Sequence, residues 1–552
     1  MTSRGRRPGR GRTVTIAGAT AVLVVGVSAT AVQAWPRSAE GHHRGRGVSA
    51  TTTPTATPTA TPTSTTSASP AQTTATTTAT PATTTAAPTA SSSAGTAATG
   101  GGTATRGDVI ANLFEWNWTS VSSECTDVLG PAGYGGVQVA PPQTSIKLSG
   151  SHPWYEVYQP AGYGLESRMG SEAQFKAMVT ACRKAGVKVY VDAVINHMAG
   201  SGGTSYGGGT FDKYTYAGLY TKDDFHHQGT ECNTSDGKIN DYENATQVNF
   251  CELVGLSDLK TESTYVRGAI DGYLNRLIGF GVSGFRVDAG KHIAKADLLA
   301  IIAGLNTTAD GEKPYVALEV TGGSGDLSPA AFTEVANVLT WGPPAQLKKA
   351  FNGKIATLKS FGESSGLPAS AKSLTFVQNH DTERDASSLT YKDGDTDRLA
   401  TQYLLAGGYG RAQVYASFTY SQSGDSPPSD AAGKISNTNC SDGRWNCLDR
   451  DKGVKGMIAF RNAVGTAKQA NWYDDGASLI AFSRGAKGWT ALNNGSSAKT
   501  QTIQTGLAAG KYCDLITGGT TTGTCSGTTI TVGSDGKATV TVPAKGAVAI
   551  TA

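Results

Sequence analysis

The sequence predicts a (β/α)8 TIM barrel, an α/β fold, followed by a small antiparallel β-domain. Short β-branched runs alternate with amphipathic segments between residues 107 and 460, which indicates parallel strands with crossover helices, in a doubly wound sheet or a barrel. Acidic and histidine residues follow several of these runs at intervals of one or two β/α units, as expected at one rim of a barrel. Residues 469–552 instead alternate Thr, Gly and Val without a helical period, which favours antiparallel strands.

Seven runs have the length and β-branched content of barrel strands. They are residues 109–113, 136–140, 187–194, 282–287, 315–320, 373–377 and 414–418. The helical segments include residues 171–184 and 263–278, where apolar side chains recur on one face.

The first 105 residues predict export. Residues 1–34 combine an arginine-rich start, an apolar stretch and a final Ala-Val-Gln-Ala, which is typical of a signal peptide cleaved after Ala34. A membrane anchor is the alternative, but small and polar residues interrupt the apolar stretch. Residues 35–105 are almost entirely Thr, Ala, Pro, Ser and Gly, so we expect a disordered Thr/Pro-rich linker. The mature chain is therefore expected to be secreted, with no membrane association after signal cleavage.

Charge and cysteine content narrow the class of protein further. The formal net charge is +4, but most of the positive charge lies in the first 46 residues, and no basic stripe suggests a nucleic-acid partner. An even number of cysteines in an exported chain predicts disulfide bonds, and sequential pairing is the simplest of many arrangements. The cysteines are Cys125, Cys182, Cys232, Cys251, Cys440, Cys447, Cys513 and Cys525.

Four of the predicted strands end in polar side chains suited to catalysis. The segment VKVYVDAVINH ends in Asp192, Asn196 and His197, GVSGFRVDAGKH in Arg286, Asp288, Lys291 and His292, YVALEV in Glu319, and LTFVQNHD in Asn379, His380 and Asp381. A single such acid could be a buried ion-pair partner, but four strand ends at unit spacing favour an active site.

Paired carboxyl groups suit the hydrolysis of a glycosidic bond, in which one protonates the leaving oxygen and the other meets the anomeric carbon. Arg286 lies two residues before Asp288, so we expect it to lower the pKa of Asp288 and keep that group ionised as the nucleophile. Glu319 lies in an apolar run, which should raise its pKa and retain the proton to be donated.

The segments DAVINH, GFRVDAGKH, ALEV and FVQNHD resemble, in order, the four signature regions of the α-amylase family, glycoside hydrolase family 13, in its actinobacterial and animal-type members. The resemblance covers residues 107 to 552. It implies that Asp288 is the nucleophile, Glu319 the acid/base, and Asp381 a third acid that orients the sugar. It also implies that sugar hydroxyls are bound by His197, Arg286, Lys291, His292 and His380.

The same resemblance implies the domain boundaries. The barrel would comprise residues 106–196 and 259–468, interrupted after its third strand by an inserted domain, residues 197–258, that Cys232–Cys251 closes. Residues 469–552 would form the C-terminal β-domain.

The segment HPWYEVYQP, residues 152–160, offers aromatic faces on which sugar rings could stack. Trp154, Tyr155 and Tyr158 would be the platforms and Gln159 a polar partner, although an ordinary aromatic core turn is the alternative. Tyr155 stands where animal-type relatives usually have a second Trp, and Tyr242 matches another subsite tyrosine.

The resemblance also implies Ca²⁺, held by Asn196, Asp258 and the main-chain oxygens of Asn249 and His292. Chloride is not expected. Two residues of the family's chloride site, Arg286 and Asn379, are present, but Gln413 stands where animal-type members have Arg or Lys. We expect Gln413 to bridge Arg286 and the nearby acids, directly or through water, and Arg411 is the one cation that could compensate.

The expected function is endo-acting, retaining hydrolysis of internal α-1,4 bonds in starch and related α-glucans by a monomer, with malto-oligosaccharides as products. A non-catalytic carbohydrate-binding protein is one alternative, which the intact Asp288, Glu319 and Asp381 disfavour. A maltogenic or transglycosylating enzyme of the same family is the other, and the products formed over time would distinguish it.

Overall fold

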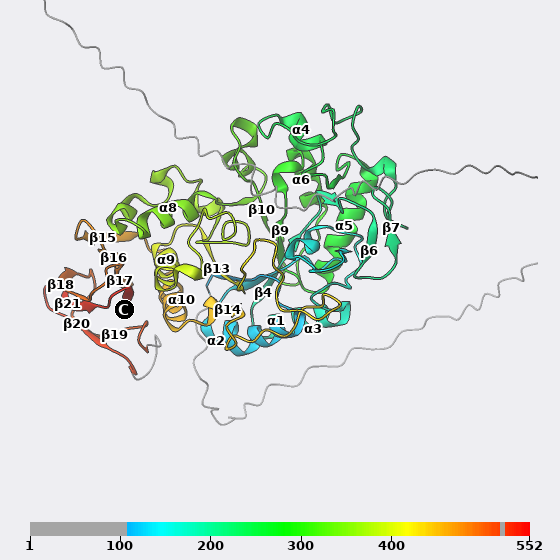
Figure 1. Cartoon of the computed structure of the whole chain (residues 1–552). Helices are drawn as coiled ribbons and strands as arrows, with labels where there is room; N and C mark the ends of the chain where they lie inside the picture. The colour runs from blue at the N-terminus through cyan, green and yellow to red at the C-terminus, as the bar shows by residue number, and fades with distance from the viewer. Residues whose placement is uncertain (1–106, 519–524) are drawn as a thin grey trace, which may run out of the picture. The chain divides into compact units, whose positions relative to one another are not determined.

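A computed structural model describes residues 107–518 and 525–552 (Figure 1). The expected signal peptide, residues 1–34, and linker, residues 35–105, lie outside the described residues. No helix in the described part of the chain is both long enough and apolar enough to span a bilayer.

The central element is a closed parallel β-barrel, which confirms the predicted fold. Strand β1 pairs with β2 on one side and with β13 on the other, so the sheet has no free edge within the barrel. Its strands are β1 (Ile110–Leu113), β2 (Gly136–Val139), β4 (Lys188–Ala193), β9 (Gly284–Val287), β10 (Tyr315–Leu318), β11 (Asn337–Leu339), β12 (Ser373–Thr375) and β13 (Arg411–Phe418). Strand β11, three residues long, was absent from the predicted runs.

Helices connect the strands and cover the outside of the barrel. They are α1 (Trp118–Glu124), α2 (Gly130–Ala132), α3 (Glu172–Lys184), α5 (Thr264–Gly279), α6 (Lys295–Gly304), α7 (Pro329–Phe332), α8 (Gly342–Phe351), α9 (Asp395–Gly407) and α10 (Lys452–Val464). Helix α3 begins where the sequence predicts, because the Ser171 hydroxyl accepts from the Gln174 amide and the Gln174 side chain accepts in return from Ser171 N.

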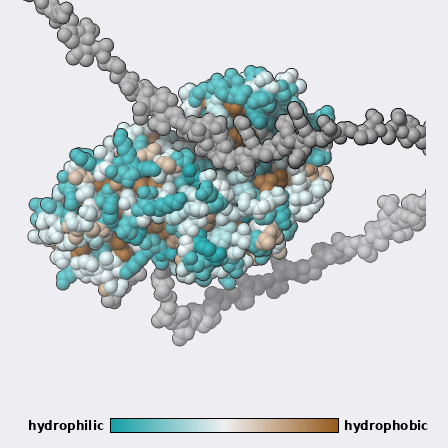
Figure 2. Space-filling view, in the orientation of Figure 1, coloured by the Kyte–Doolittle hydropathy of each residue, from teal (hydrophilic) through white to brown (hydrophobic). Residues whose placement is uncertain are grey.

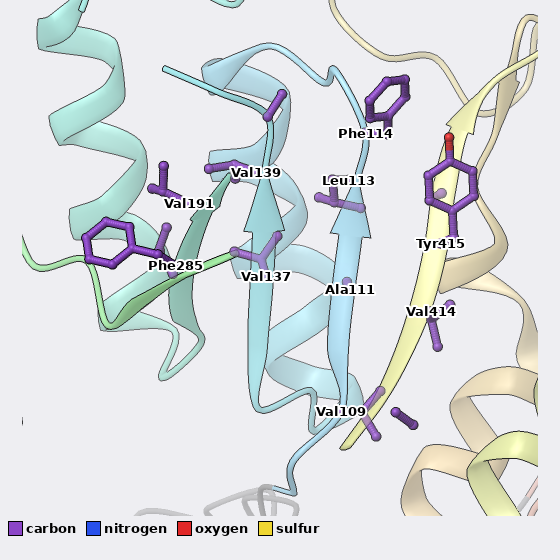
Figure 3. Close-up of a cluster of buried hydrophobic side chains, with 14 of the residues drawn as sticks. Val109, Ala111, Leu113, Phe114, Val137, Val139, Val191, Phe285, Val414 and Tyr415 are labelled. Atoms are coloured by element: carbon purple, nitrogen blue, oxygen red, sulfur yellow. The ribbon is translucent and has the colours of Figure 1, made fainter. Parts of the chain in front are cut away.

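The two-residue period of the strands separates the barrel's two faces. Val189 and Val191 of β4 belong to the core between strands and helices, which Figure 3 shows with side chains from β1, β2 and β13. Tyr190, between them, belongs instead to a second cluster with residues of β1, β10, β11 and β12. Asp192 therefore shares the Tyr190 side of β4 and lies inside the barrel.

An insertion follows the third barrel strand, as expected. It contains β5 (His197–Met198), β6 (Gly203–Ser205), β7 (Thr210–Phe211), α4 (Ala245–Phe250) and β8 (Ser257–Asp258), with β3 (Ile146–Lys147) of the β2–α3 connection joining β6. Antiparallel pairing of β5 with β8 brings the two ends of the insertion together beside the barrel.

The C-terminal part is an antiparallel β-domain, also as predicted. A four-stranded sheet and two two-stranded sheets are formed by β15 (Gln469–Asp474), β16 (Leu479–Arg484), β17 (Gly488–Asn493), β18 (Lys499–Gln504), β19 (Gly510–Cys513), β20 (Thr529–Val532), β21 (Lys537–Val542) and β22 (Gly546–Thr551). The short strand β14 (Trp445–Asn446) pairs with the end of β13.

Four disulfide bonds join the cysteines in sequential order: Cys125–Cys182, Cys232–Cys251, Cys440–Cys447 and Cys513–Cys525. The visible face of the molecule is largely hydrophilic (Figure 2). Within the described residues, Tyr265 and Leu299 are the large hydrophobic side chains that remain exposed.

Candidate active site

Strand register brings the predicted catalytic side chains to one rim of the barrel. Asp192 of β4 lies directly beside Arg286 of β9. The Asp288 amide donates to the Ala193 carbonyl (3.0 Å), and the Glu319 amide donates to the Val287 carbonyl (2.9 Å). Each acid thus stands at or just beyond the carboxyl end of its strand, where barrel enzymes place their active sites.

A single buried guanidinium contacts three carboxyl groups at this rim. One terminal nitrogen of Arg286 donates to Asp192 Oδ1 (2.7 Å) and to Asp288 Oδ1 (2.6 Å). The other lies 2.9 Å from Glu319 Oε1. Arg286 is almost fully buried, and so is Asp192.

Burial dominates the protonation of these acids. It raises the pKa of Asp288 to about 7, although the Arg286 guanidinium acts in the opposite direction. The expectation of a lowered pKa at Asp288 was therefore wrong. The pKa of Glu319 is raised, as expected, again chiefly by burial. Because Arg286 contacts both groups, the charge of this arginine does not by itself distinguish nucleophile from acid.

A second contact holds Glu319. The main-chain N–H of Ala289 donates to Glu319 Oε2 (2.8 Å). Ala289 has φ of 49°, a left-handed conformation that a residue with a Cβ adopts at some cost in energy. The turn after β9 thus presents one donor from its backbone to the carboxyl group of the neighbouring strand.

His380 and Asp381 complete the rim. The His380 ring is stacked between Phe114 (centroids 4.6 Å apart) and Tyr158 (5.1 Å), and burial lowers its pKa well below the usual value, so it is neutral. Burial also raises the pKa of Asp381 to about 7. Its side chain is 37% exposed, more than those of Asp288 and Glu319 at 11% and 14%, so it faces the open side of the site. Sequence reasoning missed Phe114, because an apolar residue after a strand resembles ordinary core.

The aromatic segment forms a short 3-10 turn, η3 (Trp154–Tyr158), beside these acids. The Tyr158 hydroxyl donates to Asp192 Oδ2 (2.9 Å), and the half-buried Trp154 ring packs edge-on against His380 (5.4 Å) and Tyr155 (5.8 Å). The turn therefore joins the expected platforms to the carboxylate cluster.

Two predicted binding residues are buried. Gln159 is buried and its side-chain oxygen accepts from the Gly200 amide (3.2 Å). His197 is also buried, with Nε2 3.1 Å from the Tyr158 carbonyl, and burial lowers its pKa to about 4. These contacts place both side chains between the insertion and the aromatic turn.

Lys291, His292 and Tyr242 are brought together on the other side. Lys291 Nζ donates to the Tyr242 carbonyl (3.2 Å), and His292 Nδ1 lies 3.2 Å from the Val248 carbonyl. The Tyr242 and His292 rings pack edge to face at 6.2 Å. These contacts link the turn after β9 to the insertion.

The expected calcium ligands gather where the insertion rejoins the barrel. Asn196 Nδ2 lies 3.3 Å from Asp258 Oδ1, both side chains are buried, and the Asn249 side chain reaches the main chain of Lys291, next to His292. In the described part of the chain, no three or more His, Cys, Asp or Glu side chains are arranged to hold a metal. A cation here would therefore rely on one carboxylate plus amide and main-chain oxygens, which is chemistry that Ca²⁺ accepts.

Sequence reasoning missed one neighbour of this cluster. His226 Nδ1 lies 2.7 Å from Asp258 Oδ2, and its Nε2 lies 3.1 Å from Glu262. His226 occurs in the insertion without a surrounding motif, so only the fold reveals its position.

The expected direct bridge between Gln413 and Arg286 is not formed. Its side-chain nitrogen donates to Gln138 Oε1 (2.8 Å), and its oxygen accepts from Asn112 (3.3 Å), so the amide joins neighbouring amides rather than Arg286. Arg411 does not compensate either. Its guanidinium stacks over Tyr315, the first residue of β10, whereas Glu319 follows the last residue of that strand.

Comparisons with known proteins agree with this geometry. Residues 158–304 match the model of the α-amylase catalytic domain, and residues 470–552 match that of the α-amylase C-terminal all-β domain. An α-amylase from Thermomonospora curvata is 43% identical and aligns with 80% of this chain and 73% of its own length. One from Tribolium castaneum is 40% identical over 79% of this chain and 91% of its own. A crystal structure of an α-amylase I mutant from Eisenia fetida with maltohexaose has a TM-score of 0.77 and 35% identity, and covers 82% of this chain and 99% of its own.

Replacing Arg286 with Met should destabilise the protein in a pH-dependent way. Loss of the cation raises the pKa values of Asp192, Asp288 and Glu319 further above their unfolded values. At a pH between the unfolded-state and the folded-state pKa of these acids, the folded protein binds more protons than the unfolded protein. The free energy of unfolding therefore falls as pH rises. We expect a loss of about 3–5 kcal/mol at pH 8 and a smaller loss at pH 5, measured by urea unfolding.

The matched control is Arg461→Met, which removes another buried arginine, bonded to the partly exposed Asp108. Its destabilisation should differ little between the two pH values. An Arg286 variant whose loss is equal at pH 5 and pH 8 would contradict the electrostatic role.

Proposed function

Because the chain belongs to the α-amylase family and is a glycoside hydrolase of that family, we propose that it cuts internal α-1,4 bonds of starch and related α-glucans with retention of configuration. Malto-oligosaccharides would be the products. The observation that carries the proposal is the contact of Asp288 and Glu319 with one guanidinium, that of Arg286. Two carboxyl groups on a single planar cation lie near each other, which suits the short separation of about 5–5.5 Å that retaining enzymes use.

In the proposed reaction, Asp288 attacks the anomeric carbon while Glu319 donates its proton to the leaving glycosidic oxygen. The resulting glycosyl ester is then hydrolysed by water, whose proton returns to Glu319. A site in which Arg286 is shared by several buried carboxyl groups favours retention of a proton, which the first step requires. Asp381, on the open side, would hold sugar hydroxyls and favour the distorted ring.

The sugar chain would lie across the aromatic turn. Trp154 and Tyr155 offer half-exposed ring surface next to His380, and Lys291 and Tyr242 would contact the chain on the opposite side. Further hydrogen bonds to the sugar, or contacts that hold neighbouring side chains in place, would come from His197, Arg286, His292 and His380. The similarity to a protein solved with maltohexaose supports a malto-oligosaccharide as the ligand.

We also propose that the mature enzyme is secreted and acts as a monomer. The four disulfide bonds support an oxidising compartment, and the arginine-rich, apolar N-terminus supports export.

Asp288→Asn should lower kcat on starch by several orders of magnitude, because the amide cannot form the glycosyl ester. Glu319→Gln should do the same through loss of the proton donor. The variants should still bind maltohexaose in calorimetry, and the wild-type products should appear first as α-anomers in NMR spectra. Either variant retaining a kcat within tenfold of the parent, or products that appear first as β-anomers, would contradict these roles.

Calcium would be held by Asn196, Asp258 and the main-chain oxygens of Asn249 and His292. When bound, the ion would supply charge neutralisation for the buried Asp258 carboxylate and a bond between insertion and barrel. The residues themselves fix the ends of the insertion, since the Leu259 amide donates to the Asn196 carbonyl (3.0 Å).

Chelation with EDTA should lower the melting temperature of the parent, because an ion that binds only the folded state stabilises it by mass action. Added Ca²⁺ should restore the melting temperature. Asp258→Asn should remove this response, whereas the matched variant Asp223→Asn, at an exposed position of the insertion, should keep it. A parent whose melting curve is indifferent to EDTA would exclude the site.

Chloride is not proposed as a cofactor. The Gln413 amide is neutral and bonds to Asn112 and Gln138, so a bound anion would rely on Arg286 for positive charge, and three carboxyl groups already contact that arginine. Activity in chloride-free acetate buffer should change less than twofold when millimolar chloride is added at constant ionic strength, where about twofold corresponds to about 0.4 kcal/mol. A many-fold increase would show that Gln413 permits an anion site.

A further inference from the structure

Arg168 is a fully buried arginine outside the carboxylate cluster. Its Nε donates to the Gly433 carbonyl (2.9 Å), one terminal nitrogen donates to the Pro153 carbonyl (3.2 Å), and the other contacts the Ser426 hydroxyl. Its side chain has no exposed surface. A guanidinium buried at this depth persists only where several acceptors surround it, and here they come from segments far apart in sequence.

Glu156 supplies the opposite charge. It lies in the middle of the Trp154–Tyr158 turn, 3.6 Å from Arg168 Nε, and it is also fully buried. Its carboxylate accepts from the Leu148 amide (2.7 Å) and from the Tyr206 hydroxyl (2.7 Å), and lies 3.1 Å from His152 Nδ1. The turn that carries the expected sugar platforms is thus held in place by the Glu156 carboxylate, both of whose oxygens accept hydrogen bonds.

The residues 420–437, here called the 420–437 loop, follow β13 and form the other partner. The Ile435 amide donates to the Arg168 carbonyl (3.0 Å), and Lys434 Nζ donates to the Ser167 carbonyl (2.7 Å). In addition, the Trp154 indole N–H donates to the Ser423 carbonyl of the same loop (2.8 Å). The loop therefore contacts both Trp154, an expected platform, and Arg168.

The loop can approach this closely only because residue 433 is glycine. Gly433 has φ of 78°, and a Cβ at this position would lie 2.2 Å from the Tyr206 hydroxyl and 2.7 Å from the His152 ring. Tyr206 and His152 are the same side chains that contact Glu156. The backbone conformation and the packing both exclude a larger residue.

We propose that Arg168 is a positioning residue for sugar binding. Through Pro153, Glu156 and the 420–437 loop it fixes Trp154 and Tyr155 in the orientation in which their rings receive the glucan. The inference rests on the proposed function, in which Trp154 and Tyr155 are sugar platforms. Arg168 touches neither substrate nor reacting atoms. Its effect should therefore appear in binding and KM rather than in the chemical step.

The chemistry of arginine makes a conservative substitution informative. Arg168→Lys keeps the charge and the pairing with Glu156, but a single ammonium nitrogen cannot reach Gly433, Pro153 and Ser426 at once in the geometry of the planar fork. Gly433→Ala perturbs the same contact from the loop side and leaves Arg168 unchanged. The two variants should give the same phenotype if positioning of the platform is what they share.

The experiment measures maltohexaose affinity by calorimetry in an Asp288→Asn background, and kcat and KM on starch in the otherwise wild-type enzyme. Both variants should weaken maltohexaose binding and raise KM about tenfold, with kcat changed less than about threefold. Trp154→Ala, measured in parallel, should weaken binding at least as much.

Two controls separate positioning from general loss of stability. Arg461→Lys alters another buried arginine that bonds two main-chain carbonyls and a carboxylate, near the start of β1 and the end of α9. Gly476→Ala places alanine at a nearly identical φ, 76°, but with no atom within 4 Å of the new Cβ. Both should lower the melting temperature and leave maltohexaose affinity within twofold of the parent.

The outcomes are distinguishable. If Trp154→Ala binds maltohexaose like the parent, the platform role within the proposed function fails, and the present inference fails with it. If Trp154→Ala weakens binding but Arg168→Lys and Gly433→Ala do not, only the inference is overturned. A fall in kcat of the same size as the rise in KM, or the same affinity loss in the controls, would show a merely structural arginine. Should Arg168→Lys not fold, Gly433→Ala alone decides between these results.

Discussion

The site depends on the Arg286 guanidinium, a single positive charge in contact with three carboxyl groups. Arg286 contacts Asp192, Asp288 and Glu319 inside the barrel, and burial raises the pKa of each of these acids. Such a cluster is costly to bury, so it requires a frame that keeps every donor in place. The register of β4, β9 and β10 provides this frame, because it fixes the three strand ends relative to one another through main-chain hydrogen bonds.

Around this cluster several side chains are held by neutral contacts, although a second buried cation, Arg384, donates to the His380 carbonyl (2.7 Å). His380 is held by stacking between Phe114 and Tyr158, Glu319 by a main-chain N–H, and Gln413 by two other amides. Of these contacts, the Ala289 N–H bonds a catalytic acid directly, and burial outweighs it, so the pKa of Glu319 stays raised. The arrangement preserves the raised pKa that a proton donor needs at neutral pH.

Much of this could be predicted from the sequence, and the exceptions have physical reasons. Catalytic candidates were found because polar residues directly after apolar strands interrupt a strong pattern. The partners of Gln413 and Arg411 were wrong because strand alternation places a side chain inside the barrel but not at a given height within it. The role of Arg168 could not be predicted, since two of its partners, Ser426 and Gly433, lie far along the chain.

Closure of the barrel has a consequence for when the enzyme acquires activity during its synthesis. The first strand, β1, completes its hydrogen bonding only with the last, β13, and the buried amides of Asn112 and Gln413 meet across 301 positions of sequence. Contacts so distant in sequence form late, because the intervening chain must first be ordered. A ribosome-bound or partly translocated chain therefore lacks an intact cleft. Glycoside hydrolase activity is therefore confined to molecules whose barrel has been completed.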